Sequence, residues 1–175
     1  KWMLPEFSNS DAWELYTLRG TLEGMAARLA AQHRTPECIL AIEAAFERLV
    51  AAVKSKRHAR VADADLALHK TIVEITGHQR LIDQYHLLEQ QVRHYIVCSN
   101  ALIMDLNQIV SEHEPIVRAI IAGDAEAAET LARDHNAPEV ERAAAAIAQE
   151  QAGNIAEAPP AKQKGRSSAR QSKAA

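Results

Sequence analysis

The segment ADADLALHKTIVEITG, residues 62–77, decides the fold class. It predicts a helix over residues 59–76 that ends at Gly77, the residue type favoured for a left-handed helix stop. Asp65 and His69 are four residues apart, so a helix places both side chains on one face, one turn apart. A carboxylate oxygen and an imidazole nitrogen at this spacing can converge on one cation. The segment therefore predicts a helix that carries half of a metal site.

Two further histidines complete the candidate site. His113 lies in SEHEPIV and His135 in LARDHN, each near the middle of a predicted helical stretch, where a buried imidazole needs a polar partner. Antiparallel packing can bring both beside Asp65 and His69. Three imidazoles and one carboxylate suit zinc, nickel, cobalt or manganese and fit calcium or magnesium poorly. The sequence predicts one metal centre inside a helical bundle, with these four residues as ligands.

Each of these residues also has a purely structural interpretation. A single histidine in such a chain is more often a surface residue or a hydrogen-bonded core residue than a ligand. An Asp and a His four residues apart often form only a hydrogen bond. Their combination with two more histidines favours the metal. Four protein ligands permit a closed tetrahedral site, or an octahedral site with two positions for water or a bidentate oxygen ligand, and both remain open.

The composition is typical of a helical domain. Of the 175 residues, 47% are hydrophobic but only 4% are aromatic, so the core must consist mainly of Ala, Leu, Ile and Val. Such a composition favours packed helices over a sheet. We predict an all-α fold, an antiparallel bundle of six to seven helices with a central metal and ligand pocket. The expected helices span about residues 10–33, 36–54, 59–76, 79–100, 106–122, 125–137 and 139–151.

Three regions are expected along the chain. Residues 1–9 read as a linker or arm, residues 10–151 as the folded domain, and residues 152–175 as a disordered basic tail without apolar anchors. Residues 151–175 hold five of the 20 basic and one of the 23 acidic residues, which leaves 15 basic and 22 acidic residues upstream. An acidic body argues against direct DNA binding by the folded domain, because duplex binding depends on neutralising phosphates.

The chain carries no sign of membrane insertion or export. It has no apolar run of the roughly 18 residues that a membrane span needs, and no basic-then-apolar leader. We therefore expect a cytoplasmic protein without a membrane partner. Because the sequence begins with Lys1 and not with Met, we also expect it to be a fragment.

Three runs of the sequence carry a family resemblance. LYTLRGTLEGMAARLAA, ADLALHKTIVEITGHQRLI and EHEPIVRAIIAGDAEAAETLARDH together resemble the FadR C-terminal (FCD) effector domain of GntR-type bacterial transcription regulators, over about residues 10–137. The resemblance implies a metal at the centre of the bundle and a small carboxylate effector that coordinates it. Zinc is the leading metal, with nickel or manganese as alternatives. By position, the family's metal ligands correspond to Asp65, His69, His113 and His135.

The resemblance also implies an effector pocket. The family uses an arginine of the first helix to face the effector carboxylate, and Arg19 in TLRGTLE occupies that position. A guanidinium gives bidentate, charge-assisted hydrogen bonds to a carboxylate, whereas the alternative is a solvated surface arginine. Arg93 and Asn100 are two further ligand-binding candidates, although Arg93 is equally well explained as exposed or paired with an acid. Pro138 should kink or end the helix that carries His135.

These observations predict the effector-sensing and dimerisation domain of a metabolite-responsive transcription regulator, not an enzyme. We expect a homodimer that reaches DNA only through a winged helix-turn-helix domain absent from this chain. One alternative is a metal-dependent enzyme acting on a small carboxylate, with Glu112 or Glu114 as general base. The other is a metal sensor or a structural metal domain. The sequence does not reveal the effector, or whether its binding releases or promotes operator binding.

Overall fold

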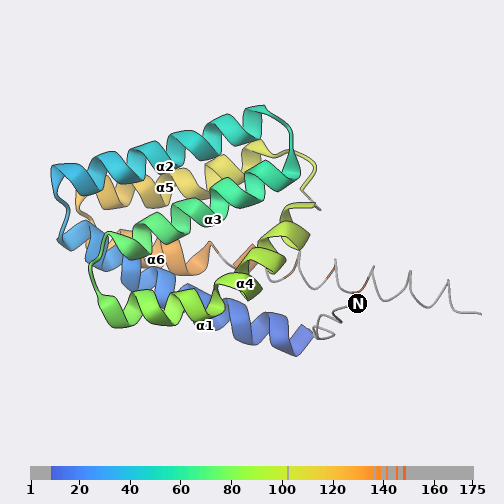
Figure 1. Ribbon diagram of the computed structural model, residues 1–175, viewed down its shortest axis with the longest axis horizontal. Helices are drawn as coiled ribbons and strands as arrows, with labels where there is room; N and C mark the ends of the chain where they lie inside the picture. Colours follow the sequence, from blue (N-terminus) through green and yellow to red (C-terminus); the bar gives the residue numbers. More distant parts are fainter. Residues whose placement is uncertain are drawn as a thin grey trace, which may run out of the picture.

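The computed structural model describes residues 9–101 and 103–135, together with residues 137, 138, 141, 145 and 148. This part of the chain forms six helices and contains no strand, which confirms the predicted all-α class (Figure 1). The expected tail over residues 152–175 lies outside the described residues, as do residues 1–8 and most of the expected seventh helix. The helices are α1 (Asn9–Gln32), α2 (Pro36–Lys54), α3 (His58–Glu74), α4 (Gln79–Ala101), α5 (Asn107–Ala122) and α6 (Ala125–Asp134).

Local sequence signals account for several helix ends. The Thr35 side chain accepts a hydrogen bond from the amide of Cys38 at 3.2 Å and so caps α2, in which Pro36 opens the first turn. Asp124 caps α6 in the same way, through the amide of Ala127 at 3.0 Å. Gly123 ends α5 with a φ of 77°, a left-handed conformation that suits glycine. These ends agree with the helix ranges expected from the sequence, which begin at residues 36 and 125 and stop at residue 122.

Two helix ends differ from the prediction. Helix α1 begins at Asn9, slightly before the expected start at about residue 10, and Asp11 lies in its first turn. There its carboxylate still faces the positive end of the helix dipole. Helix α3 ends at Glu74, and a turn follows before Gly77, whose φ of 63° is left-handed as predicted. Residues 75–77 together therefore end the helix, instead of Gly77 alone.

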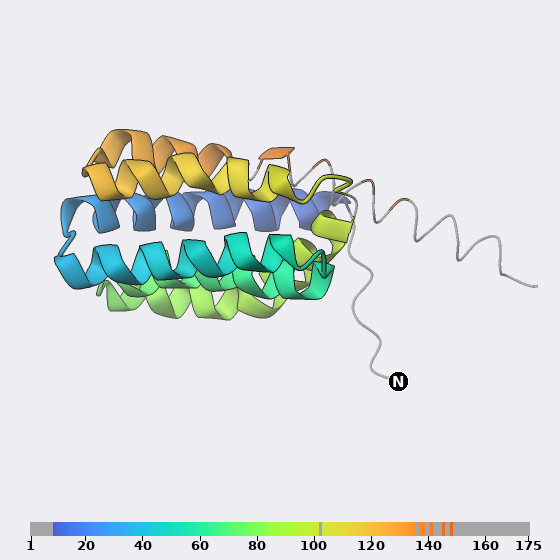
Figure 2. The same cartoon turned by 90° about the horizontal axis from the view of Figure 1, so that it is seen from above.

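Helix α1 is the central element of the bundle. It contacts α3, α4, α5 and α6, and Figure 2 shows it between α5 and α6 on one side and α2, α3 and α4 on the other. Ala26 and Ala27 are fully buried on α1, and their small side chains allow neighbouring helices to approach closely. Any side chain that α1 directs inward therefore lies near several helices at once.

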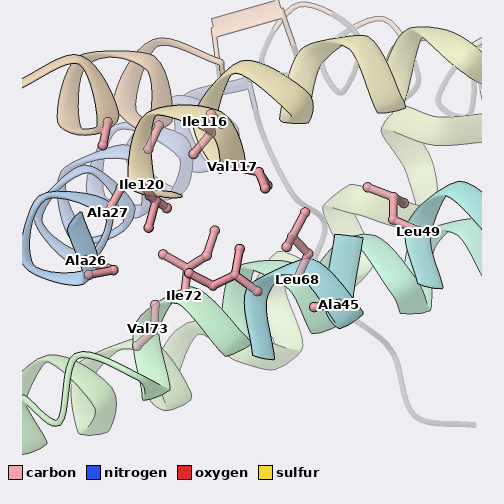
Figure 3. Packing of buried hydrophobic residues seen from close by; sticks show 14 of the residues in the cluster. Ala26, Ala27, Ala45, Leu49, Leu68, Ile72, Val73, Ile116, Val117 and Ile120 are labelled. Atoms are coloured by element: carbon pink, nitrogen blue, oxygen red, sulfur yellow. The ribbon is translucent and has the colours of Figure 1, made fainter. Parts of the chain in front are cut away.

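Two apolar clusters flank the polar residues of α3. The larger cluster joins Leu68 and Ile72 of α3 to residues of α5 such as Ile116 and Ile120, as Figure 3 shows. The smaller cluster joins α1, α3 and α4, and consists of Ala12, Leu15, Tyr16, Ala62, Leu66, Val92, Tyr95 and Ile96. Because α3 contributes to both clusters, polar residues on its inner face are shielded from water on two sides.

Within the described residues, none of the helices combines the length and the apolar character that crossing a membrane requires.

Candidate metal centre

Three buried histidines meet in the interior of the bundle. His69 comes from α3, His113 from α5, and His135 directly follows α6. Each offers a ring nitrogen, and these nitrogens lie within 4.8 Å of one another. The ring centres are 4.9 to 5.1 Å apart. Three separate helices thus bring metal-ligating groups to one point.

Asp65 lies against two of these histidines. Its Oδ1 atom is 3.1 Å from Nε2 of His113 and 3.3 Å from Nε2 of His69, while the two Nε2 atoms are 2.9 Å apart. Ligands that surround zinc at roughly 2.0–2.1 Å are themselves about 3 Å apart. The three donor atoms therefore already have the mutual spacing of a metal's ligands.

Backbone carbonyl groups determine which ring nitrogen carries the proton in His113 and His135. Nδ1 of His113 lies 2.7 Å from the carbonyl oxygen of Ile109, and Nδ1 of His135 lies 2.6 Å from that of Ala132. A carbonyl oxygen only accepts, so each Nδ1 carries the hydrogen and donates it. In the neutral ring this leaves the lone pair on Nε2, the form that binds a metal.

Two buried atoms test whether the site suits a metal. Oδ1 of Asp65 and Nε2 of His135 have no hydrogen-bond partner among the described residues. Leaving such atoms unsatisfied costs about 1–3 kcal/mol each. A cation would satisfy both atoms. The donors present therefore fit a divalent transition metal.

The charge states of these groups also suit a cation. Burial lowers the pKa of His135 well below its usual range, and neighbouring His69 and His113 lower it further, so this ring is neutral at pH 7. Burial raises the pKa of Asp65, but the imidazoles of His113 and His69 beside it hold that pKa well below its ordinary value. The centre thus combines a carboxylate with a neutral imidazole.

A second buried carboxylate, Glu23 of α1, was missed from the sequence. Its Oε1 atom accepts hydrogen bonds from Nε of Arg19 at 2.8 Å and from the hydroxyl of Tyr85 at 2.7 Å. The same oxygen lies 3.3 Å from Nδ1 of His69. Burial raises the pKa of Glu23, but the charge of Arg19, with His69 and His135, lowers it to about 2. The available signal was the spacing of Arg19 and Glu23, four residues apart on one helix.

Arg19 is buried beside the centre. Its exposed fraction is 0%, it pairs with Glu23, and its guanidinium carbon lies 5.8 Å from the ring centre of Tyr16. The solvated surface arginine that the sequence left as an alternative is therefore not what the structure shows. Arg19 joins the centre through Glu23, and Glu23 faces His69.

The other two ligand-binding candidates lie in different places. Asn100 is buried, and its side-chain amide donates to Oδ2 of Asp65 at 3.2 Å, so it orients one of the proposed metal ligands. Arg93 is about half exposed and pairs with Asp63 at 2.8 Å. The structure thus brings Asn100 to the centre and leaves Arg93 on the surface, because that face of α4 points to solvent.

His135 differs from the sequence expectation in one respect. It was expected near the middle of a helical stretch, but it lies one residue beyond the end of α6. Proline has no amide hydrogen, so Pro138 cannot donate to the carbonyl four residues earlier, that of Asp134. Asp134 is the last residue of α6, so His135 projects from the helix end.

The protein is an all-helical bundle whose centre holds a buried cluster of histidines and carboxylates. The model of the FCD domain matches residues 14–137, and the chain therefore belongs to the FCD domain family. This match confirms the resemblance noted in the sequence.

The chain is also similar to the probable D-xylose utilization operon transcriptional repressor of Paenarthrobacter nicotinovorans. The two are 28% identical over 132 residues. The similarity covers 74% of this chain and 57% of the repressor, so the chain matches little more than half the length of that relative.

Proposed function

We propose that this domain senses an effector for a transcription regulator, and that it binds a small organic acid through a divalent metal. Asp65, His69, His113 and His135 would hold the metal. The observation that carries the proposal is the convergence of these donors inside the bundle, where Oδ1 of Asp65 and Nε2 of His135 lack a hydrogen-bond partner within the described part of the chain. Membership of the FCD family, and a relative named as a transcriptional repressor, support the regulatory role.

The four protein donors would leave further coordination positions on the metal for a ligand. When bound, a divalent transition metal with four protein ligands can attract carboxylate and hydroxyl oxygens at further coordination positions. The protein's own contribution is to hold the donors in place. Asn100 orients Asp65, backbone carbonyls orient His113 and His135, and Arg19 offers a buried positive charge to an acid.

The balance of buried charge favours a monoanion. Asp65 and Glu23 are negative and Arg19 is positive, and all three are buried. Because metal-bound histidines are neutral, these groups sum to one negative charge, and a divalent cation changes the sum to one positive charge. A buried uncompensated charge is costly, and one carboxylate removes it. We therefore expect a monocarboxylate, such as a hydroxy acid or a sugar acid, to bind in preference to a dicarboxylate.

A neutral sugar is the second candidate ligand. The name of the similar repressor refers to D-xylose utilization. A pentose offers hydroxyl oxygens to a metal but brings no charge to neutralise the centre or to pair with Arg19. We therefore expect it to bind more weakly than a sugar acid.

The ligand would act through α1. Arg19 and Glu23 both lie on this helix, which contacts α3, α4, α5 and α6. A ligand that binds one arrangement of these helices more tightly shifts the population toward that arrangement. We further propose that the domain acts as a cytoplasmic homodimer and reaches DNA through a separate domain of the regulator.

Elemental analysis followed by thermal melts tests the proposal. We expect about one divalent transition metal per chain, and a melting temperature that rises with gluconate or lactate only when the metal is present. Succinate and D-xylose are the comparison ligands. An equal rise after treatment with a chelator would refute metal-mediated binding. Turnover of an acid would favour the enzyme, and a metal effect without any acid effect would favour the metal sensor.

A further inference from the structure

The ion pair with Arg19 does not account for the contact that Glu23 makes with His69. We propose that Glu23 is a positioning residue that keeps the proton of His69 on Nδ1 and so presents Nε2 of His69 to the metal. This inference rests on the proposed function, because it assigns a role toward the same metal. It adds a carboxylate to the site without making it a ligand.

Glu23 is held in place from two helices. Oε1 accepts from Nε of Arg19, four residues away on α1, and from the hydroxyl of Tyr85 on α4. Both hydrogen bonds are short, 2.8 and 2.7 Å, and Glu23 is only 3% exposed. A carboxylate fixed by a charged donor and a hydroxyl has little freedom to rotate. Its oxygen therefore forms a stationary acceptor beside α3.

That acceptor faces the outer nitrogen of His69. Oε1 lies 3.3 Å from Nδ1 of His69, while Nε2 of the same ring faces Asp65 and His113 at 3.3 and 2.9 Å. The two nitrogens of an imidazole point in different directions. Glu23 and the other donors therefore lie on different sides of this ring, so Glu23 is placed to hold a proton and not to bind the same cation through that oxygen.

The other two histidines show why His69 needs this partner. His113 and His135 each direct Nδ1 at a backbone carbonyl of their own segment. His69 directs Nδ1 at the side chain of Glu23 instead. A ligating histidine whose second nitrogen donates to a carboxylate is oriented and becomes more basic, and loss of such a partner typically lowers metal affinity about 10- to 100-fold.

The arrangement links the two halves of the proposed site. Arg19, which would face the acid, and His69, which would bind the metal, contact the same oxygen of Glu23. A substitution of Arg19 should therefore also affect His69, because both side chains contact the carboxylate of Glu23. Tyr85 ties the same oxygen to α4, so α1, α3 and α4 meet at Glu23.

Zinc affinity, measured on the full chain by competition with a chromogenic chelator and without any organic acid, tests the inference. Glu23→Gln should weaken zinc binding about 10- to 100-fold, because the amide cannot provide the same anionic acceptor. Glu129→Gln is the matched control, since Glu129 also pairs with an arginine, Arg28, at 2.7 Å but lies partly exposed. We expect it to stay within about twofold of the wild type.

A second variant covers the case in which Glu23→Gln does not fold. Glu23→Asp keeps the negative charge beside Arg19 but shortens the side chain by one methylene, which withdraws the acceptor from His69. It should weaken zinc binding in the same direction. Circular dichroism checks that each variant is folded.

The position of the His69 proton supplies an independent readout. Nitrogen-15 NMR of the zinc-loaded protein should show His69 with its proton on Nδ1 and its Nε2 bound to the metal in the wild type, and a mixture of the two forms in Glu23→Asp. Folded variants with wild-type zinc affinity and an unchanged His69 tautomer would overturn the inference. If the wild type binds no zinc, the proposed function and this inference both fail, whereas zinc binding that the Glu23 variants leave unchanged refutes the inference alone.

Discussion

His69 of α3 and His113 of α5 place their Nε2 atoms 2.9 Å apart inside the bundle. Nδ1 of His113 donates to the carbonyl of Ile109, so its Nε2 atom carries a lone pair in the neutral ring. Oδ1 of Asp65 lies within 3.3 Å of both Nε2 atoms. A cation bound by all three atoms can replace the proton of the hydrogen bond between the two Nε2 atoms, so metal binding should depend on Asp65.

Asp65→Asn should abolish metal binding. The substitution keeps the shape of the side chain but removes the negative charge beside His69 and His113, and breaking such a buried set is costly. We expect the rise in melting temperature that zinc gives the wild type to disappear. Asp63→Asn is the control, because Asp63 is exposed on the same helix and pairs with Arg93. An Asp65→Asn protein that responds to zinc as the wild type does would exclude Asp65 as a ligand.

The metal-free protein should lose stability as the pH falls below about 6.5. The folded-state pKa of His135 is well below the ordinary 6.5, so between these values the unfolded chain binds a proton that the folded chain does not. The free energy of unfolding should then fall by up to about 1.4 kcal/mol per pH unit. Glu23 acts in the same direction lower down, between its usual 4.5 and about 2.

Urea unfolding at several pH values checks this dependence. His135→Gln should flatten the decline between pH 6.5 and 5, because it removes the titrating group. Constant or rising stability of the wild type over that range would contradict the assignment of a buried, neutral His135.

Gly123→Ala should destabilise the protein more than Gly77→Ala. Both glycines are left-handed, with φ of 77° and 63°, so both substitutions carry a backbone cost of about 1 kcal/mol. A Cβ at residue 123 would also lie 2.6 Å from the guanidinium carbon of Arg34, which donates to the carbonyl of Ile121, whereas one at residue 77 meets nothing within 4 Å. The urea midpoints of the two variants measure the difference. Equal midpoints would show that the Arg34 side chain can move aside without an energetic cost.

Arg19→Lys should weaken the response to a carboxylate, whereas Arg93→Gln should leave it unchanged. Lysine keeps the charge but loses the planar fork that binds a carboxylate with two hydrogen bonds. Arg93 is exposed and bonded to Asp63, so its removal does not reach the centre. Titration calorimetry with gluconate on the metal-loaded proteins measures both effects. A larger loss in Arg93→Gln than in Arg19→Lys would place the acid elsewhere.

Local features of the sequence predicted much of this structure. The caps at Thr35 and Asp124 and the stop at Gly123 depend only on nearby residues, and they lie at helix ends that the sequence predicted, residues 36, 125 and 122. The placement of Asp65 and His69 on one helix face likewise follows from their four-residue spacing and helix geometry alone. Features of this kind do not require knowledge of how the helices pack.

Features that depend on packing were not predictable in the same way. Glu23 gains its role from Tyr85, 62 residues away, and from His69 on a third helix. The position of Arg93 was left open because helical periodicity does not decide which boundary residues face solvent. His135 was expected within a helix, and only the structure shows that it follows the end of α6.

X-ray absorption at the zinc edge of the zinc-loaded protein tests the central claim most directly. We predict nitrogen and oxygen ligands at about 2.0–2.1 Å, imidazole scattering and no sulfur, with less imidazole scattering in His113→Ala. A protein that binds no zinc, or a zinc shell that is unchanged in His113→Ala, would contradict a metal centre formed by Asp65, His69, His113 and His135.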